Sequence, residues 1–340
     1  MRIVLDSKQM RAVDNYMINT NKIPGLLLME NAAMGICDAV MERTDPCTVH
    51  VICGMGNNGG DGLAAARILL TYGYDVYVVL AGTLENMTED AARNYGLFSV
   101  LDRRTKHIQS IEDLMDWEIP EANVIVDALF GTGIAREAEG FYKALIEYIN
   151  SQDAALVVGV DVPSGISADT GAVMDVAVRA DITVTFQYPK MGHFLFPGRE
   201  YCGELIVVPI GVDEGCEVLQ EAKVCVYESQ DEDICIGRRA SNTNKGDYGR
   251  LMLIAGSKGM AGAAVLGARA ATRVGAGLVT VGAGDDVLQV VQQAVPEATC
   301  KLLQDENGML LKHSIFEIAR AAKGKTAIAA GPGLGTSDEI

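Results

Sequence analysis

Apolar runs of strand length recur along this 340-residue chain, and most of them are followed by a turn and then by an amphipathic helical pattern. After a helical segment at 7–40, we expect strands at residues 48–53, 75–80, 123–126, 155–160, 182–186 and 205–210. Near-continuous apolar strands that alternate with helices are typical of a parallel sheet covered on both faces. The sequence therefore predicts an α/β fold with a mostly parallel sheet in a three-layer sandwich.

The pattern is interrupted once, between residues 214 and 239, where the chain is acidic and less periodic. A new α/β pattern follows, with strands at 251–255, 278–281 and 326–330 and helices at 261–274 and 286–293. We place a first domain at residues 1–220, and a linker with the start of a second domain at residues 221–340. Because the second pattern stops just after the glycine turn Gly331–Gly335, where such a sheet would continue, we expect this domain to be truncated.

Charge and composition exclude several classes of function. With 28 Lys and Arg against 45 Asp and Glu, the net charge is −17, so we expect neither nucleic acid nor an anionic membrane surface as a partner. No secretory signal and no apolar run of about 20 residues is visible. None of the eight cysteines forms a C-x-x-C pair, which indicates free thiols in a reducing cytoplasm. The four histidines are isolated, so we do not expect them to bind a metal.

A glycine-rich segment, Gly54–Gly62, follows the strand at 48–53 and contains G-x-G-x-x-G. We expect it to form a loop before a helix at 63–72. Such a loop exposes backbone N–H groups to a phosphate at a helix N-terminus. The next strand ends without the acid that a dehydrogenase uses to hold the ribose, which argues against a redox domain. The added Asn57, Asn58 and Asp61 supply oxygen ligands and directional hydrogen bonds; the alternative is an Asx-rich turn that only caps the helix.

Two further strands each end at a carboxylate followed by a glycine turn: Asp127–Gly133 and Asp161–Gly165. Each Asp could bind a cation or phosphate, or could simply accept local backbone N–H bonds. Because the carboxyl ends of parallel strands meet at one edge, we expect Asn58, Asp127 and Ser164 to lie together there. One carboxylate with neutral oxygens favours a hard monovalent cation.

These three segments together resemble the NAD(P)H-hydrate epimerase family, the YjeF N-terminal domain. Leu28–Ala32, Pro189-Lys190 and Phe196–Gly198 extend the resemblance, which covers about residues 1–220, although Met55 stands where the family usually has Pro. The family implies a Rossmann-like fold and, as substrates, NADHX and NADPHX, the nicotinamide cofactors hydrated at C6. It also implies one K⁺ per domain, held by Asn58, Asp127 and Ser164.

The family also implies the roles of the other residues. Asp161 is expected to contact the hydrated ring and to act as general acid/base while stabilising iminium charge. Lys190 is a candidate phosphate contact. The expected binding residues for the rest of the substrate are Asn57, Asn58, Gly59, Gly60, Asp61, Gly131, Thr132, Gly133, Ile134, Ala135, Arg136 and Glu137.

Residues from about 230 to 340 resemble the start of the ADP-dependent NAD(P)H-hydrate dehydratase family, which has a ribokinase-like fold. The matching segments are Asn244–Gly249, Ala255–Ser257, Met260–Ala264, Gly275–Val279 and Gly331–Gly335. The resemblance places Ala263 and Gly333 at the substrate. The family keeps its ADP site in a late G-x-G-D turn; we interpret Gly282–Asp285 as a chance match, and so expect ADP to bind only where the full domain is present.

The sequence thus predicts an epimerase of damaged NADH and NADPH, joined to part of a dehydratase and able to assemble as a homodimer or higher oligomer. Two other classes stay open. One is a ribokinase-type small-molecule kinase, which needs the late G-x-G-D turn. The other is a non-catalytic nucleotide-binding protein. Loss of Asp161 or of the Asn57–Asn58 pair would have indicated that class, and the sequence keeps all three residues.

Overall fold

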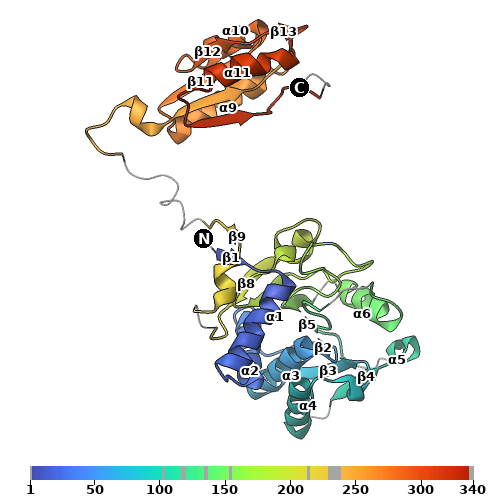
Figure 1. The fold of residues 1–340 in the computed structure, drawn as a ribbon. Coiled ribbons are helices and arrows are strands. Elements are labelled where there is room, and N and C mark those ends of the chain that lie inside the picture. The colour runs from blue at the N-terminus through green and yellow to red at the C-terminus, as the bar shows by residue number, and fades with distance from the viewer. Residues whose placement is uncertain are drawn as a thin grey trace. The chain divides into compact units, whose positions relative to one another are not determined.

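The computed structural model describes residues 2–101, 104–115, 120–133, 137–152, 155–212, 215–228 and 239–336. It forms two compact units, Met1–Glu228 and Ser229–Ile340 (Figure 1). The division falls inside the acidic stretch 214–239, but at residue 228 rather than 220. The reason is that strand β9 (Val224–Val226) pairs antiparallel with β1 (Arg2–Val4), which ties it to the first unit.

The first unit is built on a seven-stranded sheet in the order β4-β3-β2-β5-β6-β7-β8. All of its neighbouring strands pair in parallel, as the sequence predicts. The strands are β2 (Thr48–Cys53), β3 (Asp75–Ala81), β4 (Thr105–Ile108), β5 (Val124–Ala128), β6 (Leu156–Val160), β7 (Ile182–Phe186) and β8 (Glu204–Val208). The edge strand β4 was not expected, because its Thr-Lys-His sequence lacks an apolar run.

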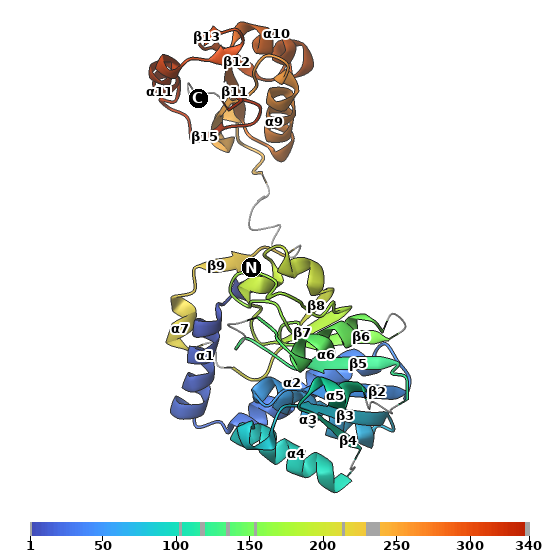
Figure 2. The same cartoon turned by 90° about the vertical axis from the view of Figure 1, so that its right-hand side faces the viewer.

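Helices cover both faces of this sheet, and alternate strand residues enter different cores (Figure 2). Val51 of β2 packs with the helices of one face, and its neighbour Ile52 packs with those of the other. The first face carries α1 (Ser7–Asn15), the π-type turn η1 (Tyr16–Thr20), α2 (Gly25–Met41), α3 (Asn57–Thr71) and α4 (Glu89–Leu101). The second face carries α5 (Ile111–Met115) and α6 (Phe141–Asn150).

The chain reverses its direction of sheet growth between β2 and β5. Strands β3 and β4 are added on one side of β2, and β5 to β8 are added on the other. The carboxyl ends of strands at such a switch point leave a crevice in which open α/β sheets bind ligands. Asn57, Asp127 and Asp161 all lie at this end of the sheet, at the start of α3, in β5 and directly after β6.

The glycine-rich segment is helical where we expected a loop. Helix α3 begins at Asn57, not at Leu63, so Asn57, Asn58, Gly59, Gly60 and Asp61 form its first turns. A Cβ atom on Gly59 would lie 1.9 Å from the carbonyl oxygen of Gly54. The glycines are thus required for close packing of α3 on the β2 turn, and their low helix propensity is overridden by that packing.

The second unit contains a four-stranded parallel sheet in the order β12-β11-β10-β15. Its strands are β10 (Arg250–Ile254), β11 (Leu278–Ala283), β12 (Thr299–Leu302) and β15 (Ala327–Ala330). It also holds helices α9 (Ala261–Val274), α10 (Asp285–Ala294) and α11 (Ile315–Ala321), and the hairpin β13 (Asp305–Glu306) and β14 (Met309–Leu310). No helix in the described part of the chain is long and apolar enough to cross a membrane.

Short helical turns complete the chain. In the first unit they are η2 (Leu84–Asn86), η3 (Met191–His193), η4 (Gly198–Tyr201) and α7 (Glu217–Gln220). In the second unit they are η6 (Lys245–Tyr248) and η7 (Lys312–Ser314). The turn η3 begins directly after Lys190 and ends at His193, and both of these side chains are buried.

Candidate active site

A cavity of about 1140 Å³ lies in the first unit, at the carboxyl ends of its strands. Such a volume exceeds the roughly 300–1,000 Å³ of ordinary small-molecule sites. The N-terminus of α3 forms part of its wall, and a Cβ atom on the capping residue Gly56 would meet open space there. The predicted site residues that line it are Asn57, Asn58, Asp61, Gly131, Thr132, Gly133, Glu137 and Asp161.

The other predicted site residues lie elsewhere. Gly59 and Gly60 are buried within α3, and Asp127 and Ser164 are buried among the strand ends without lining the cavity. Ile134, Ala135 and Arg136 fall outside the described residues. Ala263 and Gly333 belong to the second unit, where a Cβ atom on Gly333 would lie 2.7 Å from that of Ala263.

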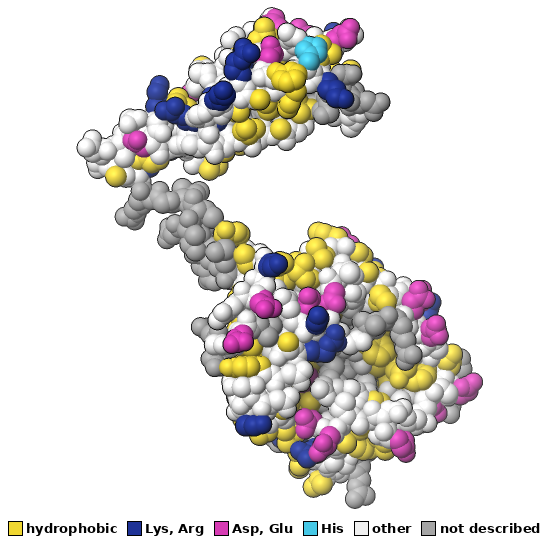
Figure 3. Space-filling model, viewed as in Figure 1, with side chains coloured by type: hydrophobic (Ala, Val, Ile, Leu, Met, Phe, Trp, Pro, Cys, Tyr) yellow, Lys and Arg dark blue, Asp and Glu magenta, His cyan; other side chains and the backbone are white. Residues whose placement is uncertain are grey.

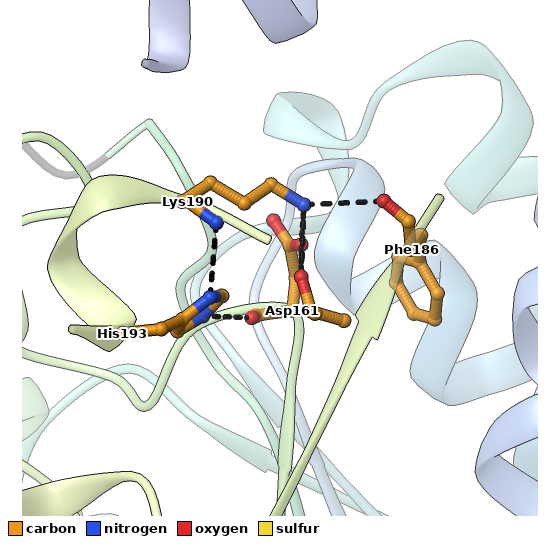
Figure 4. A network of polar contacts seen from close by, with 5 residues as sticks. Asp161, Phe186, Lys190 and His193 are labelled. Carbon is orange, nitrogen blue, oxygen red and sulfur yellow. Dashed lines mark hydrogen bonds and ion pairs between the residues drawn. The ribbon is translucent and has the colours of Figure 1, made fainter. Parts of the chain in front are cut away.

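Asp161 follows β6 in a backbone conformation that side chains seldom adopt, with φ of 64°. Its carboxylate is nearly buried, and its Oδ1 atom accepts hydrogen bonds from the Lys190 ammonium at 2.5 Å and the Thr185 hydroxyl at 3.0 Å (Figure 4). Burial is the largest single influence and would raise the pKa of Asp161, but the charge and hydrogen bond of Lys190, with smaller effects of His193 and Thr185, together hold the pKa below its ordinary value. Asp161 is therefore a carboxylate at neutral pH.

Lys190 faces inward, in contrast to the predicted phosphate contact. Its side chain is 1% exposed, and its ammonium also donates to the Thr185 hydroxyl at 2.9 Å and, at the long distance of 3.5 Å, to the Phe186 carbonyl. An ammonium has three donors, and all three are matched by acceptors of the protein. Lys190 therefore holds Asp161 in place and keeps it ionised, and it lines the same cavity.

His193 joins the backbones of these two residues. Its Nδ1 accepts from the Lys190 backbone N–H at 3.0 Å, so its Nε2 carries the proton and donates to the Asp161 carbonyl at 2.9 Å (Figure 4). Burial and the Lys190 charge lower the pKa of His193 to about 4. A neutral imidazole, with both ring nitrogens bonded to the backbone, thus holds Asp161 in its uncommon conformation.

Asp127 and Ser164 form the second polar cluster. Asp127 is fully buried and accepts from the Ser164 backbone N–H at 2.8 Å and from the Ser164 hydroxyl at 2.6 Å. Burial raises the pKa of Asp127 to about 6, although these hydrogen bonds oppose the shift. The Asn58 side chain packs on Gly131, and its buried amide nitrogen has no hydrogen-bond partner among the described residues. The Asp127 carboxylate and the Asn58 amide, whose oxygen and nitrogen can exchange places, are oxygen donors of the kind that hard cations take.

Of the other carboxyl groups that line the cavity, Asp14 of α1 and Asp61 of α3 have raised pKa values. Burial raises the pKa of Asp14 to about 6, where the negative charge of Asp161 adds to the effect and Lys190 opposes it. Burial, Asp161 and Asp14 raise the pKa of Asp61 well above its ordinary value. The cavity thus contains the ionised Asp161 carboxylate together with two carboxyl groups, Asp14 and Asp61, that retain protons more readily.

Sequence reasoning missed Asp14, Thr185 and the inward role of Lys190. No spacing along the chain connects these residues to Asp161; the sheet order and the turn η3 bring them together. A weak signal existed, because Lys190 follows a strand end directly after Pro189, as the other candidate loops follow theirs.

Comparison with known proteins identifies the class to which this fold and cavity belong. Residues 25–192 match the family of the YjeF-related protein N-terminus, and residues 251–340 match the NAD(P)H-hydrate dehydratase family. The chain belongs to the NAD(P)H-hydrate repair enzymes. The NAD(P)H-hydrate epimerase of Limosilactobacillus fermentum is 41% identical over 204 residues, which cover 60% of this chain and 94% of that protein.

Bifunctional relatives match both units. The bifunctional NAD(P)H-hydrate repair enzyme of Thermofilum pendens is 35% identical and covers 92% of this chain, and that of Salinibacter ruber is 35% identical and covers 98%. The chain spans 59% and 64% of their lengths. The crystal structure of the yeast protein ynu0 (YNL200c) shares the fold, with a TM-score of 0.54 over 67% of this chain and 97% of that chain, at 24% identity.

Proposed function

We propose that the first unit is an NAD(P)H-hydrate epimerase that interconverts the two C6 epimers of NADHX and NADPHX. The observation that carries this proposal is the ionised Asp161 carboxylate, fixed by Lys190 inside a cavity of about 1140 Å³. Loss of hydroxide from C6 leaves an iminium cation, and a buried, permanently charged carboxylate stabilises such a cation. The same carboxylate accepts a proton from the water that returns.

The rest of the dinucleotide would bind along the wall formed by α3 and the turn after β5. At the start of α3 the backbone N–H groups of Asn57, Asn58 and Gly59 have no helical partner, and Gly56 leaves space before them. These groups suit a pyrophosphate. Gly131–Gly133 and Glu137 line the same cavity and would contact the ribose, with Asp61. On the face of the first unit in Figure 3, Lys and Arg side chains lie among Asp and Glu side chains.

A K⁺ ion would be held by Asn58, Asp127 and Ser164. The buried amide of Asn58, which lacks a partner among the described residues, and the buried carboxylate of Asp127 support this assignment. When bound, such an ion would neutralise Asp127 and order the α3 and β5 turns, since a large monovalent ion polarises its ligands weakly.

The second unit would belong to an ADP-dependent NAD(P)HX dehydratase, with Ala263 and Gly333 at its substrate and ADP bound where the whole domain is present. Close contact of Ala263 with Gly333 supports their shared position. The free thiols of the described cysteines, such as buried Cys37, Cys53 and Cys202, suit the reducing cytoplasm. A homodimer or higher oligomer stays a proposal that gel filtration with light scattering would test.

The deciding experiment starts from one purified epimer of NADPHX and follows the other by proton NMR. The chain should produce the second epimer faster than the spontaneous reaction does, and faster in KCl than in choline chloride at equal ionic strength. Asp161→Asn should abolish the reaction when assayed below its unfolding midpoint, which falls because the buried Lys190 ammonium loses its counter-charge. Binding of NADPHX without epimerisation by the wild-type chain would refute the proposal and favour a nucleotide-binding protein.

A further inference from the structure

Epimerisation at C6 needs a proton donor as well as a carboxylate. The C6–O bond breaks most easily when the hydroxyl receives a proton and leaves as water. Asp161 is poorly suited to supply it, because Lys190 and Thr185 hold its Oδ1 atom and keep the group ionised. The proton must therefore come from another group that reaches the cavity.

Helix α1 presents one such group. Met10, Arg11, Asp14 and Ile18 lie on one face of α1 and η1, and all four line the cavity. Asp14 is half-buried, and among the described residues its carboxyl group has neither a hydrogen bond nor an ion pair. A free carboxyl group on a cavity wall is able to bind the substrate directly.

The start of α1 is fastened to the two segments that carry Asp161 and Lys190. Leu5 donates its backbone N–H to the Pro189 carbonyl at 3.0 Å, and its own carbonyl accepts from Met191 at 3.3 Å, so it brackets Lys190. The Ser7 backbone and hydroxyl donate to the Asp169 carboxylate at 2.6 and 2.7 Å. These bonds fix α1 against the Asp161 turn, and the charges of Lys190 and Asp161 both act on Asp14.

We propose that Asp14 is a catalytic residue of the epimerase, the acid that protonates the departing C6 hydroxyl at the stage when Asp161 is ionised; this rests on the proposed function. The proton passes from the Asp14 carboxyl to the hydroxyl oxygen, and the C6–O bond breaks with its electron pair on the leaving water. The ring nitrogen lone pair forms the iminium. Water then adds to the other face of C6 and gives its proton to Asp161, which releases it to solvent, and Asp14 takes up a proton from solvent.

The charged groups around Asp14 support this division. Asp161 and Lys190, whose charges act on Asp14, come from the strand ends, and Arg11 lies on α1 itself with a long 3.4 Å bond to Ser7. The other charged groups that line the cavity are Asp61, Asp90, Glu137 and Glu139. Burial and Asp161 raise the pKa of Asp14 to about 6, despite Lys190. Two carboxyl groups in one cavity with separated pKa values are a common arrangement for an acid and a base.

The test compares Asp14→Asn with Asp61→Asn, the same change at the other protonated carboxyl group of the cavity, and with Asp38→Asn on the exposed side of α2. D14N should lose about 100-fold or more in kcat, with little change in KM. Wild-type kcat/KM should fall as the pH rises above about 6, the value for Asp14, and D14N should lack that decline. D61N should raise KM and keep the decline, and D38N should match the wild type.

A D14N rate within threefold of the wild type, an unchanged decline, or its loss in D61N instead would overturn the proposal. Asp14→Ser provides a second variant if D14N misfolds. Carbon-13 NMR titration of the Asp14 carboxyl in the ligand-free chain adds a readout that does not need activity: a midpoint near 6 supports the assignment, and one near 4 overturns it. Failure of the wild-type chain to epimerise NADPHX would instead refute the proposed function.

Discussion

Replacing Lys190 with methionine removes the positive end of the buried pair and keeps most of the apolar stem. The change deletes the ammonium bonds to Asp161, Thr185 and the Phe186 carbonyl and leaves the Asp161 carboxylate buried without its counter-charge. Breaking a buried ion pair by removing one partner costs about 3–5 kcal/mol. We expect K190M to lose about 3 kcal/mol of unfolding free energy at pH 7. This value is at the lower end of the range because Asp161 can bind a proton and so remove its uncompensated charge.

The loss should depend on pH in a definite direction. In the wild type the pKa of Asp161 is below its ordinary value, so its stabilising effect is complete above about pH 4 and disappears in acid as pH falls through the native pKa. In K190M burial is opposed only by the smaller effects of Thr185 and His193, and so raises the native pKa of Asp161. Above that pKa the buried charged form of Asp161 destabilises the variant. The difference in unfolding free energy between K190M and the wild type therefore shrinks as pH falls from 7 toward about 4.

Hydrogen exchange of the full chain, read by mass spectrometry at the β6 and β7 amides, measures this effect within the first unit. The Asp161 amide, which donates to the Val184 carbonyl at 2.8 Å, is a suitable reporter. The matched control is K190M combined with D161N, which removes the unpaired charge and should recover part of the loss. An equal loss at pH 7 and pH 4.5, or no recovery in the double variant, would refute the reasoning.

Neighbouring features lead us to expect three more outcomes. Burial raises the pKa of Asp127 to about 6, so its charged form is unfavourable above that pH. KCl should therefore raise the melting temperature, relative to choline chloride, more at pH 7.5 than at pH 5. D127N should show no such difference between the two salts. Gly59→Ala should cost about 3 kcal/mol of unfolding free energy in urea by overpacking, because its Cβ would lie 1.9 Å from the Gly54 oxygen. Gly56→Ala should keep its stability in the same assay, because a Cβ there meets open space, and should lose NADPHX affinity. Because the pKa of His193 is lowered to about 4, the unfolded chain binds its proton first, and the wild type should lose stability between pH 6.5 and 4; H193Q should flatten that slope in thermal melts.

Strand positions and site candidates were accessible from the sequence because each depends on neighbouring residues. The apolar run at 48–53 is β2, and the carboxylate that follows 156–160 lies at the cavity. The predicted start of α3 was wrong for a physical reason: Gly59 is a poor helix former by itself, and its packing against Gly54 decides the outcome.

The pairing of Asp161 with Lys190 was not accessible in the same way. The two residues are 29 positions apart, and their contact depends on β6 and β7 lying side by side and on the turn η3. Asp14 lies on a helix whose sequence pattern indicates only an amphipathic surface. Its place at the cavity comes from the bonds of Leu5 and Ser7, which join segments more than 160 residues apart.

The pairing of β1 with β9 has a consequence for how such genes are assembled. Arg2 lies opposite Val226, so the chain enters and leaves the first unit at the same place. A domain whose first and last strands pair at its surface tolerates fusion to another domain, because the fusion does not disturb its core. The single-unit relative in Limosilactobacillus fermentum and the longer bifunctional relatives fit this view. A second module can be joined after Glu228 while the seven-stranded sheet and its cavity stay whole.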